Sequence, residues 1–436
     1  MEHVNKKILL LSTGDVNGAY EAIYKLSFFL KQEGFQVAMV VKDKTRSDDF
    51  IKAYKPIEPK VDSLVFRIFQ KVKYKLIKSK QAPRIILEPK YGFFSTDETS
   101  NNISASSLID QIGFAPDFII TGMTINFINS TDLLALQQYT KAQVYNITVD
   151  MNHFTGGCHF AWDCTGYITG CTDNCPAILS AVANDKAKIN FETKLKNAQT
   201  GNFNIIAGSG WTLDQARKSK IYKDQKTIIN INSLIDTTIL NNKSRHFAKA
   251  IFNLEENKFY ILMGCQNANE ARKGFDYLLE SLNILDKKLS VAQKERIEVL
   301  IVSRTNSDNF SKIPFAKRHI DFIKDYRLLS LLYQASDVFV NSSIEDSGPM
   351  MVSEALACGT PVVGFDMGVV SNMVINDYNG YKAVLKDSQD LAVGIEKIIS
   401  LSKESYSEYS YNAVKQVENF SSMNYAKEEF KKILNV

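Results

Sequence analysis

The hydrophobic pattern at the start of the chain predicts a strand, a helix and a second strand. Residues 7–12 form an apolar run of strand length, and residues 19–32 repeat their apolar positions at helical spacing. Gly34 ends that helical segment, and residues 35–41 form the next apolar run. This order is that of a parallel βαβ unit.

The same alternation of apolar runs and helical segments recurs along the whole chain. Further strands are predicted at 116–121, 142–149, 258–264, 297–303, 338–341 and 362–365. Alternating strands and helices imply parallel sheets with right-handed crossovers. Two such series predict an α/β protein with two Rossmann-like domains.

Composition changes this picture little. A chain of 436 residues is long enough for two domains, and 45% hydrophobic with 23% charged residues is ordinary for globular proteins. A net charge of +4 is too small to indicate nucleic acid, so we expect no such partner. No apolar run approaches the roughly 20 residues of a membrane span and no signal peptide is visible, so we expect a cytoplasmic protein.

The segment 342–363 contains the residues that most clearly indicate a functional site. It places Asp346 and Glu354 eight positions apart, with a Gly-Pro turn between them and Gly359 after the helix that contains Glu354. The order is strand, loop, helix, strand, and a helix N-terminus at a strand end suits a diphosphate. A carboxylate one turn into that helix can accept hydrogen bonds from sugar hydroxyls. The alternative is a surface helix with solvated acids.

This segment resembles the signature of glycosyltransferase family 4, whose members are retaining nucleotide-sugar enzymes with the GT-B fold, two Rossmann-like domains facing a cleft. The signature is an acid, seven residues, Glu, then Ala-Met/Leu-Ala-Cys-Gly-x-Pro-Val-Val, and residues 346–363 match it. The resemblance implies that Glu354 holds the donor ribose. It implies that the first acid, either Asp346 or the preceding Glu345, contacts the donor sugar.

Two further elements of the family concern the donor diphosphate. The sequence Arg272-Lys273-Gly-Phe resembles the family's Lys-Gly element, in which the lysine neutralises the diphosphate. A cation there would stabilise charge growing on the leaving phosphate, whereas a merely solvated basic helix start is disfavoured by the helix dipole. The first glycine loop, at 14–18, faces the donor or acceptor in this family. The implied donor-binding residues are Gly18, Arg272, Lys273, Gly348, Met350, Met351 and Glu354.

The predicted catalytic centre of the first domain is less regular. The sequence from Val149 to His159 resembles a subgroup motif, His-Asp-Met-x-x-x-Thr-Gly-Gly-Cys-His, in which Asp150 matches and Val149 replaces the histidine. His153 either takes over its role or is a structural histidine. The resemblance implies that the donor phosphate oxygen accepts the acceptor proton and that catalysis needs no cofactor. The candidate catalytic residues are therefore Asp150, His153, Asp346 and Glu345.

Four of the six cysteines fall in one short segment. They are Cys158, Cys164, Cys171 and Cys175. Disulfides are uncommon in cytosolic proteins, so clustered thiols indicate a metal, with zinc favoured over an iron–sulfur cluster. Such a structural zinc ion would hold a cleft-facing loop together and take no part in catalysis. The alternative is reduced, packed thiols or a local disulfide.

The segment 65–80 is basic and amphipathic. On a helix, one face would carry Val65, Phe69, Val72 and Leu76, and another would carry Arg67, Lys71, Lys75 and Lys78. Such a helix can lie on an anionic membrane surface, which would place the protein peripherally on the inner membrane face. A solvated basic helix packed on the first domain is the alternative.

These elements predict an N-terminal acceptor-side domain at 1–225, with a return helix at 416–436, and a nucleotide-sugar-binding domain at 226–415. The predicted function is retaining transfer of a hexose from a nucleotide-sugar donor to a glycan or lipid-linked acceptor, in surface polysaccharide synthesis. An epimerase or phosphorylase is disfavoured by the acidic pair. A catalytically silent nucleotide- or sugar-binding partner subunit and a metal-stapled interaction protein are the remaining alternatives.

Overall fold

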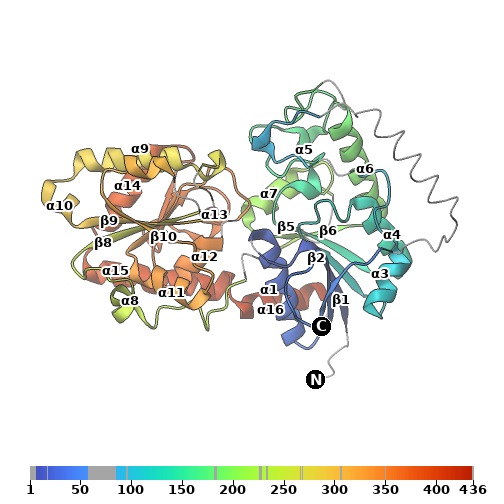
Figure 1. Cartoon of the computed structure of the whole chain (residues 1–436), viewed down its shortest axis with the longest axis horizontal. Helices are drawn as coiled ribbons and strands as arrows, with labels where there is room; N and C mark the ends of the chain where they lie inside the picture. Colours follow the sequence, from blue (N-terminus) through green and yellow to red (C-terminus); the bar gives the residue numbers. More distant parts are fainter. Residues whose placement is uncertain are drawn as a thin grey trace, which may run out of the picture. The chain divides into compact units, whose positions relative to one another are not determined.

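Figure 1 shows the chain as a computed structural model. The structure describes residues 6–16, 18–56, 85–94, 97–180, 184–224, 228–231, 234–265, 267, 269–304, 307–348 and 350–434. The basic segment at 65–80 lies outside the described residues. The chain forms two compact units. Unit 1 comprises Met1–Ile147, Met151–Ile205 and Ala216–Lys226, and unit 2 comprises Thr148–Asp150, Ile206–Gln215 and Thr227–Val436. The predicted domain boundaries and the return of residues 416–436 to the first domain stay predictions.

The first sheet has seven strands in the order β3-β2-β1-β4-β5-β6-β7. Their bounds are β1 Lys7–Gly14, β2 Gln36–Asp43, β3 Ile51–Ala53, β4 Phe118–Thr121, β5 Gln143–Thr148, β6 Asn204–Ala207 and β7 Ile228–Asn230. The pairs β1–β2, β2–β3, β1–β4 and β4–β5 are parallel. The apolar run Ile8 to Leu11 is fully buried because helices cover both faces of such a sheet.

Helices connect these strands. Their bounds are α1 Gly18–Gln32, α3 Ala105–Ile112, α4 Ser130–Thr140, α5 Gly166–Thr169, α6 Lys186–Thr200 and α7 Gly210–Lys218, with short 3₁₀ turns η1 Pro89–Tyr91 and η2 Asn152–Phe154. Helix α1 buries Ile23, Leu26, Phe29 and Leu30, which are the helical-period positions of the sequence. Helix α4 begins with a capping box in which Asn129 and Asp132 exchange side-chain and backbone hydrogen bonds.

The second sheet has six parallel strands in the order β10-β9-β8-β11-β12-β13. Their bounds are β8 Phe259–Gly264, β9 Ile297–Ser303, β10 Ala316–Asp321, β11 Val338–Asn341, β12 Val362–Phe365 and β13 Gly380–Ala383. The helical elements of this unit are α8 Arg245–Ile251, η3 Ala271–Lys273, α9 Phe275–Lys288, α10 Val291–Glu295, η4 Asp308–Lys312, α11 Tyr326–Ala335, α12 Met350–Ala357, α13 Val370–Met373, α14 Ser388–Ile399, α15 Lys403–Phe420 and α16 Met423–Leu434. Helices α9 and α14 cover one face of the sheet, and α8, α11 and α15 cover the other (Figure 1).

The strand order of each sheet reverses once. In unit 2 the chain runs from β8 outward through β9 and β10, then crosses to β11 on the other side of β8. In the first sheet the same reversal lies between β1 and β4. Ligands of open α/β sheets bind outside the carboxyl ends of the strands at such a switch point. The topology therefore predicts a ligand site at the loops that follow β8 and β11.

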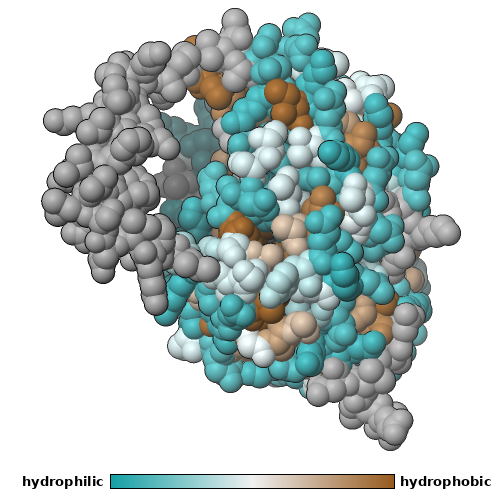
Figure 2. All heavy atoms as spheres, turned by 90° about the vertical axis from the view of Figure 1, so that its right-hand side faces the viewer, coloured by the Kyte–Doolittle hydropathy of each residue, from teal (hydrophilic) through white to brown (hydrophobic). Residues whose placement is uncertain are grey.

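The surface of unit 1 shown in Figure 2 is mostly hydrophilic, and hydrophobic residues occur there in separate spots within the coloured area. Among the described residues, no helix combines the length and the apolar composition that crossing a membrane would require.

Candidate functional site

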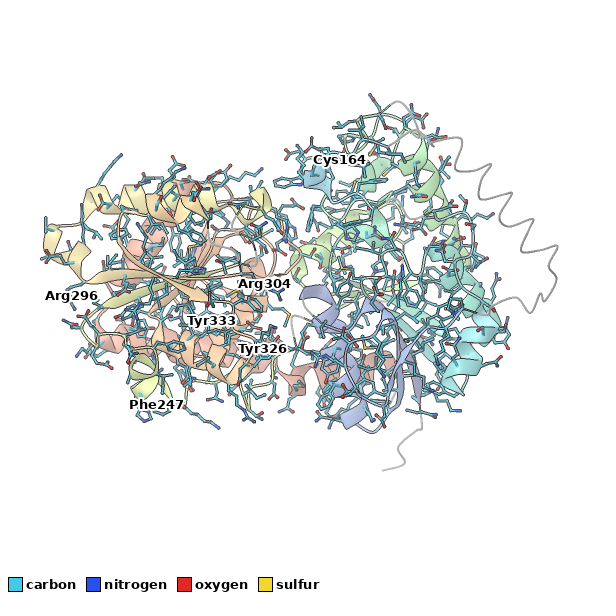
Figure 3. The ribbon with its side chains drawn as sticks, viewed as in Figure 1. Cys164, Phe247, Arg296, Arg304, Tyr326 and Tyr333 are labelled. Carbon is cyan, nitrogen blue, oxygen red and sulfur yellow. The ribbon has the colours of Figure 1, made fainter. Side chains whose placement is uncertain are left out.

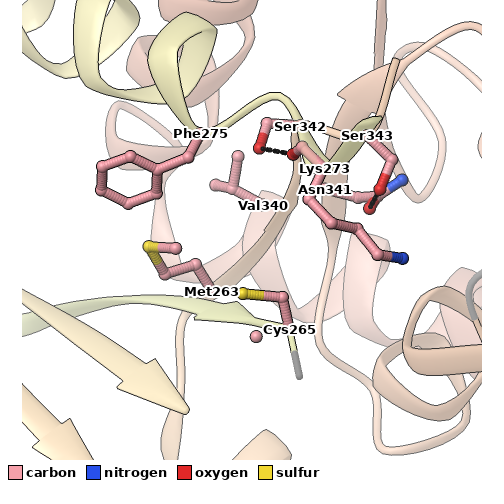
Figure 4. Close-up of a pocket in the computed structure, with 9 residues that line it drawn as sticks. Met263, Cys265, Lys273, Phe275, Val340, Asn341, Ser342 and Ser343 are labelled. Atoms are coloured by element: carbon pink, nitrogen blue, oxygen red, sulfur yellow. Dashed lines mark hydrogen bonds between the residues drawn. The ribbon is translucent and has the colours of Figure 1, made fainter. Parts of the chain in front are cut away.

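Two loops meet at the switch point of unit 2. The backbone N–H of Ile344 donates to the Arg272 carbonyl at 2.8 Å, and Ser342 Oγ donates to the Lys273 carbonyl at 2.9 Å (Figure 4). Gly274 lies between these contacts with φ of +63°, and a Cβ there would stand 2.0 Å from the Ser342 oxygen. Only glycine allows this approach, so Gly274 brings the loop after β8 against the loop after β11.

The two basic residues that are predicted to bind the diphosphate both contact an acidic residue of the loop after β11. Arg272 Nη1 is 3.0 Å from Asp346 Oδ2, and Lys273 Nζ contacts the same oxygen. Arg272 Nη2 also lies 2.7 Å from Glu270 Oε2. Burial favours the neutral Asp346 carboxyl, but Lys273 and Arg272 outweigh it and hold the pKa of Asp346 below its usual range. Asp346 is therefore a carboxylate that holds both cations in place.

A small pocket opens beside this cluster. It is lined by Met263, Gly264, Cys265, Lys273, Phe275, Val340, Asn341, Ser342 and Ser343 (Figure 4). Asn341 is 6% exposed, and its Oδ1 accepts from Ser343 Oγ at 3.1 Å. Its Nδ2 finds no hydrogen-bond acceptor among the described residues. A buried donor without a partner costs about 1–3 kcal/mol, so an acceptor atom in this pocket would stabilise the site.

Helix α12 begins beside the same strand ends. Its Met351 side chain packs against Gly264. The contact is so close that a Cβ added to this glycine would stand 2.2 Å from Met351 Cε. Before the helix, the Gly348 N–H donates to Asp346 Oδ1 at 3.4 Å. The free N–H groups of the first helical turn thus start next to the end of β8, where an anion would gain from the helix dipole.

Glu354 lies inside unit 2, one turn along α12. It is 3% exposed, and its Oε2 accepts from the Oη of Tyr333 on α11 at 2.9 Å. Figure 3 labels Tyr333 within this unit. Burial and the Glu354 charge together raise the pKa of Tyr333 well above its ordinary value, so the hydroxyl stays a donor. The Tyr333 hydroxyl therefore holds one carboxylate oxygen of Glu354, the residue predicted to bind the donor ribose.

The candidates predicted for the first domain lie on separate elements of the chain. His153 Nε2 lies 3.0 Å from the Gly122 carbonyl, just after β4, and His153 lines a pocket with the buried ion pair of Lys194 and Glu98, whose atoms are 3.5 Å apart. Gly18 opens α1 with φ of +52°, and nothing lies within 4 Å of where its Cβ would be. Asp150 is 4% exposed and is grouped with unit 2.

The four predicted metal-ligating cysteines come together in unit 1. Cys158 is buried, Cys164, Cys171 and Cys175 are half-buried, and all four are free thiols (Figure 3 labels Cys164). They belong to one hydrophobic cluster. As the side chains stand, no three His, Cys, Asp or Glu residues in the described part of the chain are arranged around a common metal position.

Sequence reasoning missed Asn341, Tyr333 and Glu270 as members of the site. Asn341 carried a usable signal, since a polar residue that ends a buried strand at a switch point often faces a ligand. Tyr333 and Glu270 carried none, because only the tertiary packing brings them to Glu354 and Arg272.

Residues 244–416 match the family model described as "Glycosyl transferases group 1". An uncharacterized glycosyltransferase of Haemophilus influenzae is 26% identical over 196 residues, 43% of this chain and 51% of the relative. One of Methanocaldococcus jannaschii is 32% identical over 102 residues, 23% of this chain and 26% of the relative. The chain therefore spans about half and a quarter of the lengths of these relatives.

Solved structures resemble the chain over nearly its whole length. Sucrose-phosphate synthase from Thermosynechococcus elongatus aligns with a TM-score of 0.63 and 14% identity, covering 99% of both chains. Anabaena HepE, solved with UDP and glucose, aligns with a TM-score of 0.61 and 14% identity over 99% of both chains. TarM aligns with a TM-score of 0.62 and 14% identity, covering 100% of this chain and 99% of TarM. These likenesses confirm the prediction of the GT-B fold.

Proposed function

We propose that this GT-B chain, with its glycosyl transferases group 1 match at 244–416, is a retaining glycosyltransferase that moves a hexose from a nucleotide-sugar donor. One observation carries the proposal. Lys273, Arg272 and Asp346 meet at the switch point of the second sheet, beside the free N–H groups that open α12. Cations and free amides at the end of a strand are what a diphosphate needs.

Each group has a role in this proposal. Lys273, Arg272 and the amides of Gly348, Met350 and Met351 bind the donor diphosphate, and Gly18 stays a predicted donor contact. Glu354 accepts hydrogen bonds from the ribose hydroxyls, and Tyr333 holds its carboxylate in place. Asp346 or Glu345 binds the transferred sugar. The contacts of both cations with Asp346 support Asp346 as that acid.

The proposed reaction is a transfer with retention. The bond between the sugar C1 and the diphosphate oxygen breaks, and a bond from C1 to the acceptor hydroxyl oxygen forms on the same face of the sugar. The acceptor proton passes to the departing phosphate oxygen, and a nucleoside diphosphate leaves. The cations stabilise the charge that grows on the diphosphate, so positioning and electrostatics carry the catalysis, without a cofactor. Asp150 and His153 are proposed to orient the sugar and acceptor.

The acceptor is proposed to be a glycan or a lipid-linked saccharide of surface polysaccharide synthesis. A lipid-linked acceptor would bring the protein to the inner face of the membrane, where the basic segment 65–80 would contact anionic lipid. Vesicle sedimentation tests this location. Salt-sensitive binding to anionic vesicles is expected, and equal binding to neutral vesicles would contradict it.

A panel of nucleotide sugars and nucleoside diphosphates, starting with UDP-glucose, tests the function. We expect selective binding by the wild type, weaker binding by Glu354→Ala, and release of nucleoside diphosphate when a glycan acceptor is added. NMR of the product anomer tests retention, and an inverted product would refute that part. A folded wild type that binds no member of the panel would refute the donor site.

A second candidate is a catalytically silent nucleotide- or sugar-binding subunit. Val149 at the position of the subgroup histidine favours it. This candidate predicts binding of the donor with neither hydrolysis nor transfer, and restoration of the histidine by Val149→His would then give turnover only if the rest of the centre is intact.

A further inference from the structure

The four clustered cysteines lie in a part of unit 1 with little regular structure. Between the end of β5 at Thr148 and the start of α6 at Lys186, the described residues form only the short η2 and α5. Connections of this length without strands or long helices are uncommon in compact domains, and need something beyond backbone ladders to hold them.

The hydrophobic cluster under this segment is small. Its buried members are Tyr91, Phe93, Cys158, Ala177, Ile178 and Ala187, and Ile85, Leu87, Trp162 and the other three cysteines pack against them. It is tied to the residues before η1 by the antiparallel bridge between Leu87 and Ile178. A core of this size gives a small loop-rich region limited stability, and proteins commonly strengthen such regions with a metal ion or disulfides.

The four cysteine side chains lie near one another. The thiols of Cys158 and Cys175 are hydrogen-bonded to each other, and Cys158 also lies within electrostatic range of Cys164 and Cys171. A Cβ on Gly166 would stand 3.4 Å from the Sγ atoms of both Cys164 and Cys171. Four cysteines that are spread over 18 positions of sequence therefore face one small region.

Backbone N–H groups also point at these sulfurs. Cys175 accepts from the N–H groups of Ala177 and Ile178, Cys164 accepts from Gly166 at 3.4 Å, and Cys171 accepts from Gly156. Hydrogen-bond partners around metal-ligating side chains orient those side chains and tune the bound ion. The donors around these sulfurs are therefore consistent with a metal site.

We propose that Cys158, Cys164, Cys171 and Cys175 bind one structural zinc ion. The thiols lose their protons to solvent as four sulfur–zinc bonds form, and the N–H donors and the nearby Lys194 offset part of the remaining negative charge. Because the described side chains do not yet surround a common metal position, binding of the ion would require the cysteine side chains to change their torsions. The zinc ion would hold the segment between β5 and α6 together, and it would take no part in glycosyl transfer.

Metal analysis of the full-length wild type, purified without chelator, tests the proposal first. We expect about one zinc ion per chain, released in step with the modification of about four thiols by a mercurial reagent. Three results would overturn it: six freely reactive thiols with no bound metal, a disulfide found by mass spectrometry, or iron with acid-labile sulfide.

Paired variants locate the ion. Cys164→Ser/Cys171→Ser should lose most of the zinc, whereas Cys265→Ser, which changes a cysteine of unit 2, should keep it. Should the double variant fail to fold, cobalt exchange in the wild type gives an independent answer, because a tetrathiolate site produces an intense sulfur-to-cobalt absorption. Zinc retained by the folded double variant, or a cobalt form without that absorption, would refute the assignment.

Discussion

Replacing Lys273 with methionine tests the proposed diphosphate site most directly. Methionine keeps much of the length of the side chain and removes its charge. Arg272 lies 3.0 Å from Asp346 and would remain its partner, so we expect only the loss of one hydrogen bond to a charged group, about 1.5–3 kcal/mol of folding stability. The change therefore removes a phosphate contact without leaving an unpaired buried acid.

The expected loss of affinity follows from the position of the ammonium group. Two unit charges about 4 Å apart interact with about 4 kcal/mol at an effective dielectric constant of 20, which is an upper bound. The Lys273 side chain is 19% exposed, so solvent screens part of this. Charge-assisted hydrogen bonds contribute about 1.5–3 kcal/mol. At 1.4 kcal/mol for each factor of ten, the Kd for a nucleoside diphosphate should rise roughly 10- to 150-fold.

Lys288→Met is a matched control. Lys288 ends α9, the helix that follows Lys273, and pairs with Glu396 at 3.1 Å. The Lys288→Met variant loses a more exposed lysine–carboxylate pair about 20 Å away along the helix. Titration calorimetry with the tightest nucleoside diphosphate of the panel compares the two variants. Equal affinity of Lys273→Met, Lys288→Met and the wild type would refute the assignment of Lys273 to the diphosphate.

Three further changes test the packing and the charges of the site. Gly274→Ala should lower the free energy of unfolding by at least about 2 kcal/mol, because its Cβ would meet a backbone oxygen at 2.0 Å. Gly113→Ala, also at positive φ but in open space, should lose about 1 kcal/mol, and equal losses in urea titrations would contradict the close approach. Tyr333→Phe should weaken binding of ribose-containing ligands or lower stability by about 1.5–3 kcal/mol, because Glu354 loses a buried donor; unchanged values of both would show that the bond contributes nothing. The lowered pKa of Asp346 stabilises the fold above its unfolded pKa of about 3.9 and ceases to do so as the pH falls through the folded pKa. The stability difference between wild type and Asp346→Asn should thus shrink below about pH 4, and a difference that grows on acidification would have the wrong sign.

Much of the fold could be predicted because its central strands are buried on both faces. The apolar runs at 7–12 and 338–341 became strands of the two sheets for this reason. Strand β10 was missed because it forms an edge of its sheet, where Ala316–Asp321 alternates exposed and half-buried residues and carries four charged or histidine side chains. Strand β3, with three residues, was too short to show a period.

The sequence named candidate residues for the site, but it did not predict the contacts among them. Lys273 and Asp346 are 73 positions apart, and nothing in either local sequence shows that their side chains touch. That contact depends on how closely two loops approach, which the single glycine at 274 decides through tertiary packing. The same holds for Asn341 Nδ2, because only the packing of the described residues shows that this donor has no acceptor among them.

The ion pairs of Asp346 also bear on which anions the site can select. Its carboxylate is tethered beside Lys273 and Arg272, so it competes with every incoming anion at an effective concentration that free ions in solution seldom match. A singly charged anion would have to replace the carboxylate in a one-for-one exchange. A diphosphate bound as proposed would contact both cations and the amides of α12 together. Asp346 would therefore act as an internal competitor that favours ligands with more than one anionic group.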